Sequence, residues 1–237
     1  MQQPKIFVAS PIFKTTTRHT VTSLVELAVA LTARGWWGSL GCLSRPDIAT
    51  LRDAFVTVWY DQMQDRTHIL QIDDDMDFDP QLIFDMVEFD KPIVGAIYPK
   101  KTSPLQFVGD PLDSPPEPVN GHQLQRWVGA GVLLIRRDAI DTMLAKMPEI
   151  IDTRIAKQSI KDLLQYFNCN RIFRLFDEVE TEDGPLGEDY SFCHRARQCG
   201  LEIWANVAHR IIHVGEYGYQ GCYADVIRAG GQNAPAA

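Results

Sequence analysis

Five carboxylates crowd the chain directly after a short apolar run. The run is residues 69–72, and the acids that follow it are Asp73, Asp74, Asp75, Asp77 and Asp79. Like charges this close repel one another, and a folded site tolerates them when a hard divalent ion such as Mg²⁺ or Mn²⁺ neutralises them. The competing interpretation is a solvated acidic turn, with Asp79 as the N-cap of a helix that begins near Pro80.

A second acidic pair, Glu188 and Asp189, begins a predicted helix that ends before Gly200. Asp189 shares a helical face with Phe192 and Ala196, which points its carboxylate inward. The helix dipole favours an ionised carboxylate at this position, so Asp189 could act as a general base. A plain helix cap is the alternative.

Arg52 lies in the middle of an apolar helical face that Ile48, Phe55 and Trp59 define. A charge on such a face needs a partner, and an arginine fork suits either a bound diphosphate or an internal carboxylate. The neighbouring Asp53 could hold Arg52 or a ribose hydroxyl, although a solvated helix face is the favoured position for it.

His213 follows a short apolar strand and precedes Gly215. A histidine in this setting, taken alone, is more often a hydrogen-bonded core residue. Together with Asp73 and Asp75 it becomes a neutral imidazole ligand that could complete a carboxylate site for Mn²⁺.

The elements that must position these side chains alternate along the chain. Strands are predicted at residues 5–9, 69–72, 92–98, 127–135 and 210–213, and helices at 20–34, 46–62, 80–89, after 135 as far as 147, and 188–199. This alternation predicts an α/β fold with a mostly parallel sheet and helices on both faces, which binds ligands at the carboxyl ends of its strands. We expect one domain over residues 1–228, a functional or mobile loop at 103–126, and a disordered tail at 229–237.

Composition narrows the class of protein. The chain has 237 residues, of which 45% are hydrophobic and 23% charged, with a formal net charge of -8. This acidic balance argues against a general nucleic-acid binder. No apolar stretch approaches the roughly 20 residues that span a bilayer, and the polar start does not resemble a signal peptide, so a cytoplasmic protein is expected. The five scattered cysteines predict reduced thiols and no zinc site.

Five motifs in this order resemble those of GT-A glycosyltransferases. They are the acids 73–75, the segment Gly-Ala-Ile-Tyr-Pro-Lys-Lys at 95–101, the glycine-bearing strand 128–132, the pair Glu188-Asp189, and His-Val-Gly at 213–215. The resemblance extends from Lys5 to about Tyr223 and is strongest to small bacterial or viral enzymes of the family-2 type. It implies a GT-A, Rossmann-like fold and transfer of a sugar from a nucleoside diphosphate sugar, with UDP as the expected nucleotide, to a hydroxyl of a glycan or other acceptor.

The resemblance also implies roles for individual residues. Asp73, Asp75 and His213 would bind Mn²⁺ or Mg²⁺, and Asp189, with Glu188 beside it, would deprotonate the acceptor and so invert the anomeric centre. Members of the family can also retain the anomeric configuration, which is the alternative if Asp189 is structural. The expected donor contacts are Arg52, Asp53, Asp73, Asp74, Lys100, Gly129 and Gly131. The pair Asp75 and Asp77 is the alternative to the pair Asp73 and Asp75 as metal ligands. The pair Asp73 and Asp75 is preferred because the apolar strand ends at Ile72. Lys100 or Lys101 could help Arg52 to stabilise the departing diphosphate. The two glycines could instead only permit tight packing.

Two other classes of protein compete with this assignment. A nucleotidyltransferase would normally have a Gly-rich basic loop after the first strand, whereas residues 10–14 are Ser-Pro-Ile-Phe-Lys. A noncatalytic carbohydrate- or cation-binding module would gain nothing from an inward Asp189, which is costly to bury.

Overall fold

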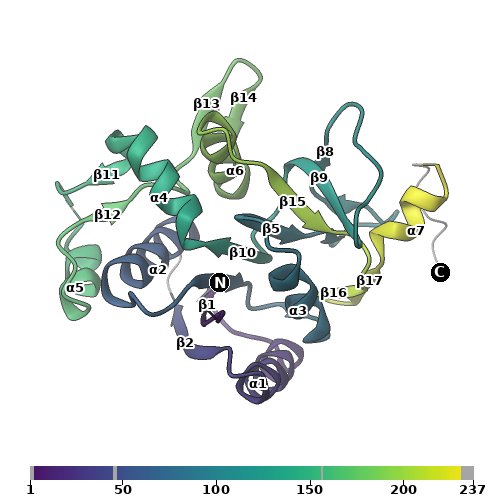
Figure 1. The fold of residues 1–237 in the computed structure, drawn as a ribbon, viewed down its shortest axis with the longest axis horizontal. Coiled ribbons are helices and arrows are strands. Elements are labelled where there is room, and N and C mark those ends of the chain that lie inside the picture. The colour runs from purple at the N-terminus through teal and green to yellow at the C-terminus, as the bar shows by residue number, and fades with distance from the viewer. Residues whose placement is uncertain (1–2, 45–46, 156, 231–237) are drawn as a thin grey trace.

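An eight-stranded sheet forms the centre of the protein, with strand order β2-β1-β3-β10-β5-β15-β9-β8. The structure is a computed structural model, and it describes residues 3–44, 47–155 and 157–230 (Figure 1). The strands of this sheet are β1 (Ile6–Ile12), β2 (Trp37–Ser44), β3 (His68–Ile72), β5 (Ile93–Ala96), β8 (Asp110–Pro111), β9 (His122–Trp127), β10 (Val132–Arg136) and β15 (Ile203–Asn206).

The sheet is mixed but mostly runs one way. Strands β1, β2, β3, β5, β8 and β15 share one direction, and β9 and β10 run in the opposite one. The expected α/β class with a mostly parallel sheet is therefore confirmed. The carboxyl ends of β1, β2, β3 and β5 lie at one edge of the sheet, where open sheets of this kind bind ligands.

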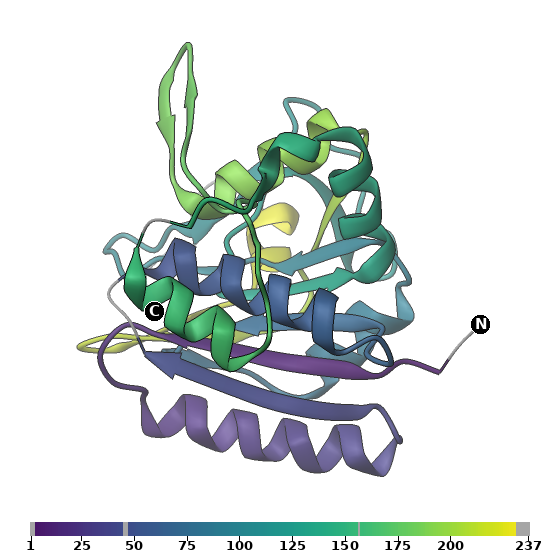
Figure 2. The ribbon, with the colours of Figure 1, turned by 90° about the vertical axis from the view of Figure 1, so that its left-hand side faces the viewer.

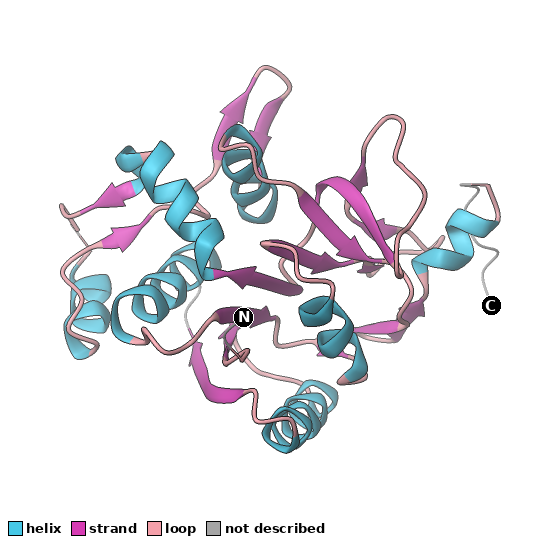
Figure 3. Ribbon diagram, in the orientation of Figure 1, coloured by secondary structure: helices cyan, strands magenta, loops and turns pink. Residues whose placement is uncertain are grey.

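Helices cover both faces of the sheet (Figure 3). On one face lie α1 (Arg18–Ala33) and α3 (Gln81–Glu88), and on the other α2 (Ile48–Gln62), α4 (Arg137–Lys146) and α6 (Glu188–Gln198). Strand β1 shows why: Ile6 and Val8 pack with the first group, and Phe7 and Ala9 with the second, because alternate side chains point to opposite faces. Figure 2 shows α1 below β1 and β2, with α2 above them.

Smaller sheets and helices surround this core. Strand β4 (Met76–Asp77) pairs with β16 (Ile211–Val214), which pairs with β17 (Gly218–Gly221). The hairpin of β13 (Val179–Thr181) and β14 (Gly184–Leu186) projects from the body of the protein (Figure 2). The remaining elements are β6 (Tyr98–Pro99) with β7 (Phe107–Val108), β11 (Ile151–Asp152) with β12 (Ile172–Phe173), η1 (Pro148–Ile150), α5 (Gln158–Tyr166) and α7 (Tyr223–Arg228).

The C-terminal ends of two helices follow their predicted signals. Gly35 and Gly200, each two residues after the last residue of α1 or α6, have φ of 70° and 79°, a conformation that favours glycine. Asp79 Oδ1 accepts a hydrogen bond of 2.8 Å from Gln81 N, the first residue of α3, but the N-cap is Pro80 and not the predicted Asp79. No helix among the described residues has the length and apolar character needed to cross a membrane.

Two predictions of secondary structure need correction, and some elements, among them β2 and α5, were not predicted. The stretch 127–135 is not one strand, because the chain breaks between β9 and β10 at the glycines 129 and 131. The segment 103–126 is not a plain loop, since it contributes β7, β8 and most of β9 to two sheets. The predicted helix start at Pro46 and the tail 231–237 lie outside the described residues, while Ala229 and Gly230 form a turn after α7.

Candidate active site

The acid cluster lies at the carboxyl end of β3, as predicted. Every residue of β3 is buried, and the strand ends at Ile72. Asp73 N then donates to Gly131 O at 3.0 Å, which fixes Asp73 beside the start of β10. Helix α2 brings Arg52 to this point and α6 brings Asp189.

The guanidinium group of Arg52 contacts both of these acids. Its side chain is only 2% exposed, and its Nη2 donates to Asp73 Oδ1 at 2.8 Å while its Nε lies 3.6 Å from Asp189 Oδ1. The remaining nitrogen, Nη1, donates to Gln71 Oε1 at 3.1 Å and to the carbonyl of Ala130 at 3.4 Å. Of the two roles open to Arg52 from the sequence, this geometry favours the partner of internal acids over the ligand of a diphosphate.

Asp189 combines burial with an unused acceptor. Burial raises the pKa of Asp189, the charge of Asp73 raises it further, and Arg52 lowers it. The pKa of Glu188 is raised as well, by burial and then by Asp189. Within the described part of the chain, Asp189 Oδ1 and Arg52 Nε make no hydrogen bond. Oδ1 is enclosed beside Arg52, whereas the Asp189 side chain as a whole stays 22% exposed, so a bound hydroxyl would meet the other carboxylate oxygen. A carboxyl group with a raised pKa is suited to take the proton of that hydroxyl.

A second cluster forms around Asp75. The pairing of β4 with β16 sets Met76 opposite His213, so His213 Nε2 lies 3.3 Å from Asp75 Oδ1. Lys101 Nζ lies 2.5 Å from Asp75 Oδ2. Burial raises the pKa of Asp75, but His213 and Lys101 outweigh it and leave that pKa below its usual value.

His213 is held in one orientation. Its Nδ1 lies 2.9 Å from the carbonyl oxygen of Pro99, which can only accept, so Nδ1 carries the proton. The other ring nitrogen, Nε2, faces Asp75 Oδ1: it donates to that oxygen when it carries a proton, and it offers a lone pair to a metal ion when it does not. Carbonyl contacts of this kind orient the histidine ligands of metal ions.

The predicted three-residue metal site is not assembled. Among residues 3–44, 47–155 and 157–230, no three His, Cys, Asp or Glu side chains converge closely enough to hold a metal. The predicted ligand Asp73 is engaged by Arg52. Asp75 and His213 still fit a divalent ion as a pair, since they present a carboxylate oxygen and an imidazole nitrogen, and such ions often take other ligands from substrate phosphates and water.

The alternative pair of metal ligands, Asp75 with Asp77, is not supported. Asp77 Oδ1 accepts from Ser23 Oγ at 2.9 Å, and Asp77 Oδ2 lies 3.2 Å from His19 Nδ1, so this carboxylate faces α1. Asp74 also has a local partner, because its Oδ2 accepts from Phe13 N at 2.9 Å and so fixes the loop after β1.

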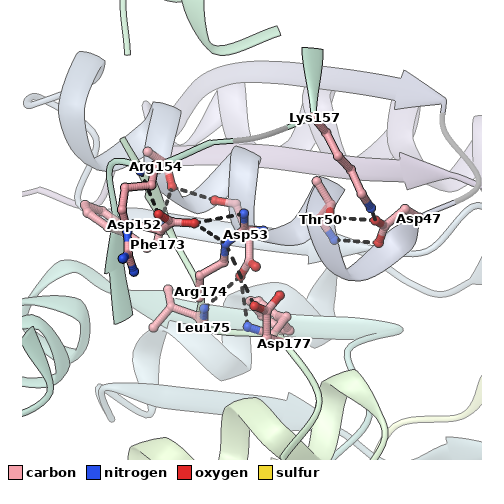
Figure 4. Close-up of polar contacts among 12 residues, drawn as sticks. Asp47, Thr50, Asp53, Asp152, Arg154, Lys157, Phe173, Arg174, Leu175 and Asp177 are labelled. Carbon is pink, nitrogen blue, oxygen red and sulfur yellow. Dashed lines mark hydrogen bonds and ion pairs between the residues drawn. The ribbon is translucent and has the colours of Figure 1, made fainter. Parts of the chain in front are cut away.

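Asp53 is neither solvated nor paired with Arg52, and those expectations are wrong. It is fully buried, and its Oδ1 accepts hydrogen bonds of 2.9 Å from both Leu175 N and Phe176 N (Figure 4). Burial raises its pKa well above the usual aspartate value. Asp53 anchors the segment around Leu175, and a side chain so enclosed is not available to a donor.

Gly129 and Gly131 make room for Tyr98. A Cβ on Gly131 would lie 2.6 Å from Tyr98 Cζ, and one on Gly129 would overlap the Tyr98 hydroxyl. Gly131 N also donates to Tyr98 Oη at 3.2 Å. This geometry explains both glycines by tight packing, and their contact with a donor stays a prediction.

Sequence reasoning missed some members of the site. Gln71 and Tyr98 were not singled out, although a glutamine inside a buried strand is itself a signal of a polar partner. Of the two candidate lysines, it is Lys101 whose ammonium reaches an acid of the cluster. Lys100 donates its backbone N–H to Gln106 O at 2.6 Å, and its side chain remains a predicted donor contact.

Comparison with known proteins finds no matching family model and no curated protein with a matching sequence. Solved structures that resemble this one include the protein A197 from STIV, at 14% identity and a TM-score of 0.48, covering 89% of this chain and 86% of that one. A glycosyltransferase involved in glycosylation of the major capsid of PBCV-1 matches at 14% identity and a TM-score of 0.36, covering 58% of this chain and 62% of that one.

A third similar structure is a mutant of Drosophila β-1,4-galactosyltransferase 7 in complex with manganese, UDP-Gal and xylobiose. It matches at 13% identity and a TM-score of 0.43, covering 98% of this chain and 76% of that one. Glycosyltransferases of the GT-A type are thus among the structural neighbours, as the motifs predict. All three TM-scores lie below 0.5, so these similarities do not indicate a function for this chain.

Proposed function

We propose that this chain is a cation-dependent glycosyltransferase that moves a sugar from a nucleoside diphosphate sugar, with UDP as the nucleotide, to a hydroxyl acceptor. The observation that carries the proposal is the arrangement around Asp189. Its carboxyl group has a raised pKa and stays 22% exposed, while Arg52 Nε, 3.6 Å from the enclosed Oδ1, ties it to the acid cluster at the end of β3.

Asp75 and His213 would hold Mn²⁺ or Mg²⁺ through a carboxylate oxygen and Nε2. The ion would neutralise negative charge that develops on the departing diphosphate. Asp73 stays 27% exposed although Arg52 holds one of its oxygens, so its other oxygen can accept a hydrogen bond from a donor hydroxyl. Asp74, Lys100, Gly129 and Gly131 remain predicted donor contacts.

Asp189 would act on the acceptor. The carboxylate oxygen of Asp189 that does not face Arg52 would take the proton from the acceptor hydroxyl as the new bond to the sugar forms and the bond to the diphosphate breaks. Attack on the face opposite the diphosphate inverts the anomeric centre. Glu188, whose pKa is also raised, adds a second negative charge at the start of α6 and favours protonation of Asp189 once the proton arrives.

Calorimetric titration with UDP, GDP and their common sugar conjugates, first with Mn²⁺ and then with EDTA, tests the proposal. We expect one nucleoside diphosphate to bind only when Mn²⁺ is present. Asp75→Ala should abolish that binding, whereas Asp77→Asn, a change in the same acid cluster but facing α1, should retain it. Absence of binding by every nucleotide under both conditions would reject the proposed donor.

A further inference from the structure

We propose that Lys101 occupies the cation position when no divalent ion is bound, and that a divalent ion must displace its ammonium from Asp75 in order to bind. The inference rests on the proposed function, because it concerns the same cation site. It assigns to Lys101 control of how tightly the site binds the ion.

The contacts of Asp75 place the ammonium at this position. One carboxylate oxygen of Asp75 faces His213 Nε2 at 3.3 Å, and the other faces Lys101 Nζ at 2.5 Å. Lys101 therefore engages one oxygen of Asp75 before an ion arrives, and His213 engages the other while its Nε2 carries a proton. The ammonium of Lys101 already neutralises the charge of Asp75. An incoming divalent ion therefore gains less binding free energy from Asp75 than it would from a carboxylate without a cationic partner.

A neighbouring glycine, Gly215, leaves room for the methylene groups of the Lys101 side chain. A Cβ on Gly215 would lie 3.1 Å from Lys101 Cδ and 3.5 Å from its Cε, so the glycine two residues after His213 leaves space for the stem. The chain just before Lys101 is tied to the same site, since Pro99 O accepts from His213 Nδ1 at 2.9 Å. Lys101 and His213 thus reach Asp75 as parts of one assembly.

The ammonium is nevertheless free to leave. The Lys101 side chain is 37% exposed, compared with 22% for Asp75 and 17% for His213. Lysine is a point charge on a flexible stem, so its head can move into solvent while Asp75 and His213 stay in place. A donor diphosphate would favour the exchange, because its oxygens offer the displaced ammonium a new partner, and the ion and the donor should then bind cooperatively.

Titration of the nucleotide-free protein with Mn²⁺, followed by the electron paramagnetic resonance signal of free Mn²⁺, tests this inference. Lys101→Met keeps the length of the stem and removes the charge, and we expect it to bind Mn²⁺ at least about tenfold more tightly than the wild type. Lys91→Met is the matched control, because Lys91 also pairs with a carboxylate, that of Glu202 at 3.3 Å, and is 38% exposed; it should bind Mn²⁺ as the wild type does. Equal or weaker Mn²⁺ binding by Lys101→Met would overturn the inference.

The outcomes separate this inference from the proposed function. If the wild type and Lys101→Met bind Mn²⁺ equally, and Asp75→Ala abolishes binding in both, the cation site stands and only the displacement by Lys101 is rejected. If neither protein binds Mn²⁺, the cation position does not exist, and the inference fails together with the metal dependence of the proposed function. If Lys101→Met binds Mn²⁺ more tightly than the wild type, and the double variant with Asp75→Ala does not bind it, the result supports both the cation site and the displacement of Lys101.

Discussion

Replacement of Arg52 with Met removes the cation that two carboxylates share. Arg52 is 2% exposed and lies 2.8 Å from Asp73 and 3.6 Å from Asp189. Methionine is flexible and fills irregular space in a core, so the substitution tests the charge more than the volume. The variant leaves Asp73 and Asp189 together at the end of β3 without the countercharge that neutralises them.

The expected loss of stability follows from this burial. Removal of one partner from a buried ion pair costs about 3–5 kcal/mol. Asp73 and Asp189 are 27% and 22% exposed, and a carboxylate can also escape by taking up a proton, so we expect a loss near the lower end, about 3 kcal/mol. For a protein of this size, such a loss lowers the Tm by about 6–12 °C.

The loss has a defined dependence on pH. Burial raises the pKa of Asp73 and of Asp189, so the folded protein binds more protons than the unfolded one. The contribution of these acids to stability therefore falls as pH rises from the usual aspartate range through their raised pKa values. Arg52 lowers both pKa values, and its removal raises them further. The stability deficit of Arg52→Met should thus be larger at pH 7.5 than at pH 5.

Urea unfolding of the wild type and of Arg52→Met at these two pH values measures the effect. Arg228→Met is the control: Arg228 pairs with Asp225 at 2.6 Å, but the two side chains are 75% and 51% exposed, and such pairs contribute less than about 1 kcal/mol. A loss below about 1 kcal/mol for Arg52→Met, or a deficit that does not shrink at pH 5, would refute the role of Arg52 as the shared countercharge.

Three further results are expected. Asp189→Asn should stop sugar transfer while donor binding measured by calorimetry stays intact, and full turnover by this variant would exclude Asp189 as the base. Because burial raises the pKa of Asp189, the pH–rate profile of the wild type should lose activity on the acid side at a pH above the usual aspartate pKa. An acid limb at the ordinary aspartate value would contradict this. Gly131→Ala should destabilise the protein by about 1–3 kcal/mol in urea unfolding, because its Cβ would meet Tyr98, and a loss below about 0.5 kcal/mol would contradict this packing.

Much of the fold was predictable because its signals are local. The buried strand β3 and the acids after it are adjacent in sequence, and the spacing of Asp189 and Phe192 on a helix is enough to point Asp189 inward. The strand β2 gave no such signal, since Trp-Gly-Ser-Leu-Gly-Cys-Leu-Ser has two glycines and weak alternation. Its place beside β1 depends on tertiary pairing.

The contacts of the site were harder to predict because they join distant segments. The sequence predicts a metal site of His213 with Asp73 and Asp75. Only the pairing of β4 with β16 shows that, of these two acids, Asp75 is the one that contacts His213. Arg52 was recognised as a charge that needs a partner, but the choice between a diphosphate and an acid depended on where α2 packs. The direction of Asp53 likewise depended on a segment more than a hundred residues away.

The most direct test of the proposed glycosyl transfer is detection, by mass spectrometry, of nucleoside diphosphate released from a panel of nucleotide sugars in the presence of Mn²⁺ and a mixture of glycan acceptors. We predict that the wild type releases UDP and extends an acceptor by one sugar, and that Asp189→Asn, which still binds the donor, does neither. Release of sugar 1-phosphate in place of UDP would show that the nucleotide is transferred and would indicate a nucleotidyltransferase, and the absence of any donor turnover by the wild type would contradict the proposal that this site transfers a sugar.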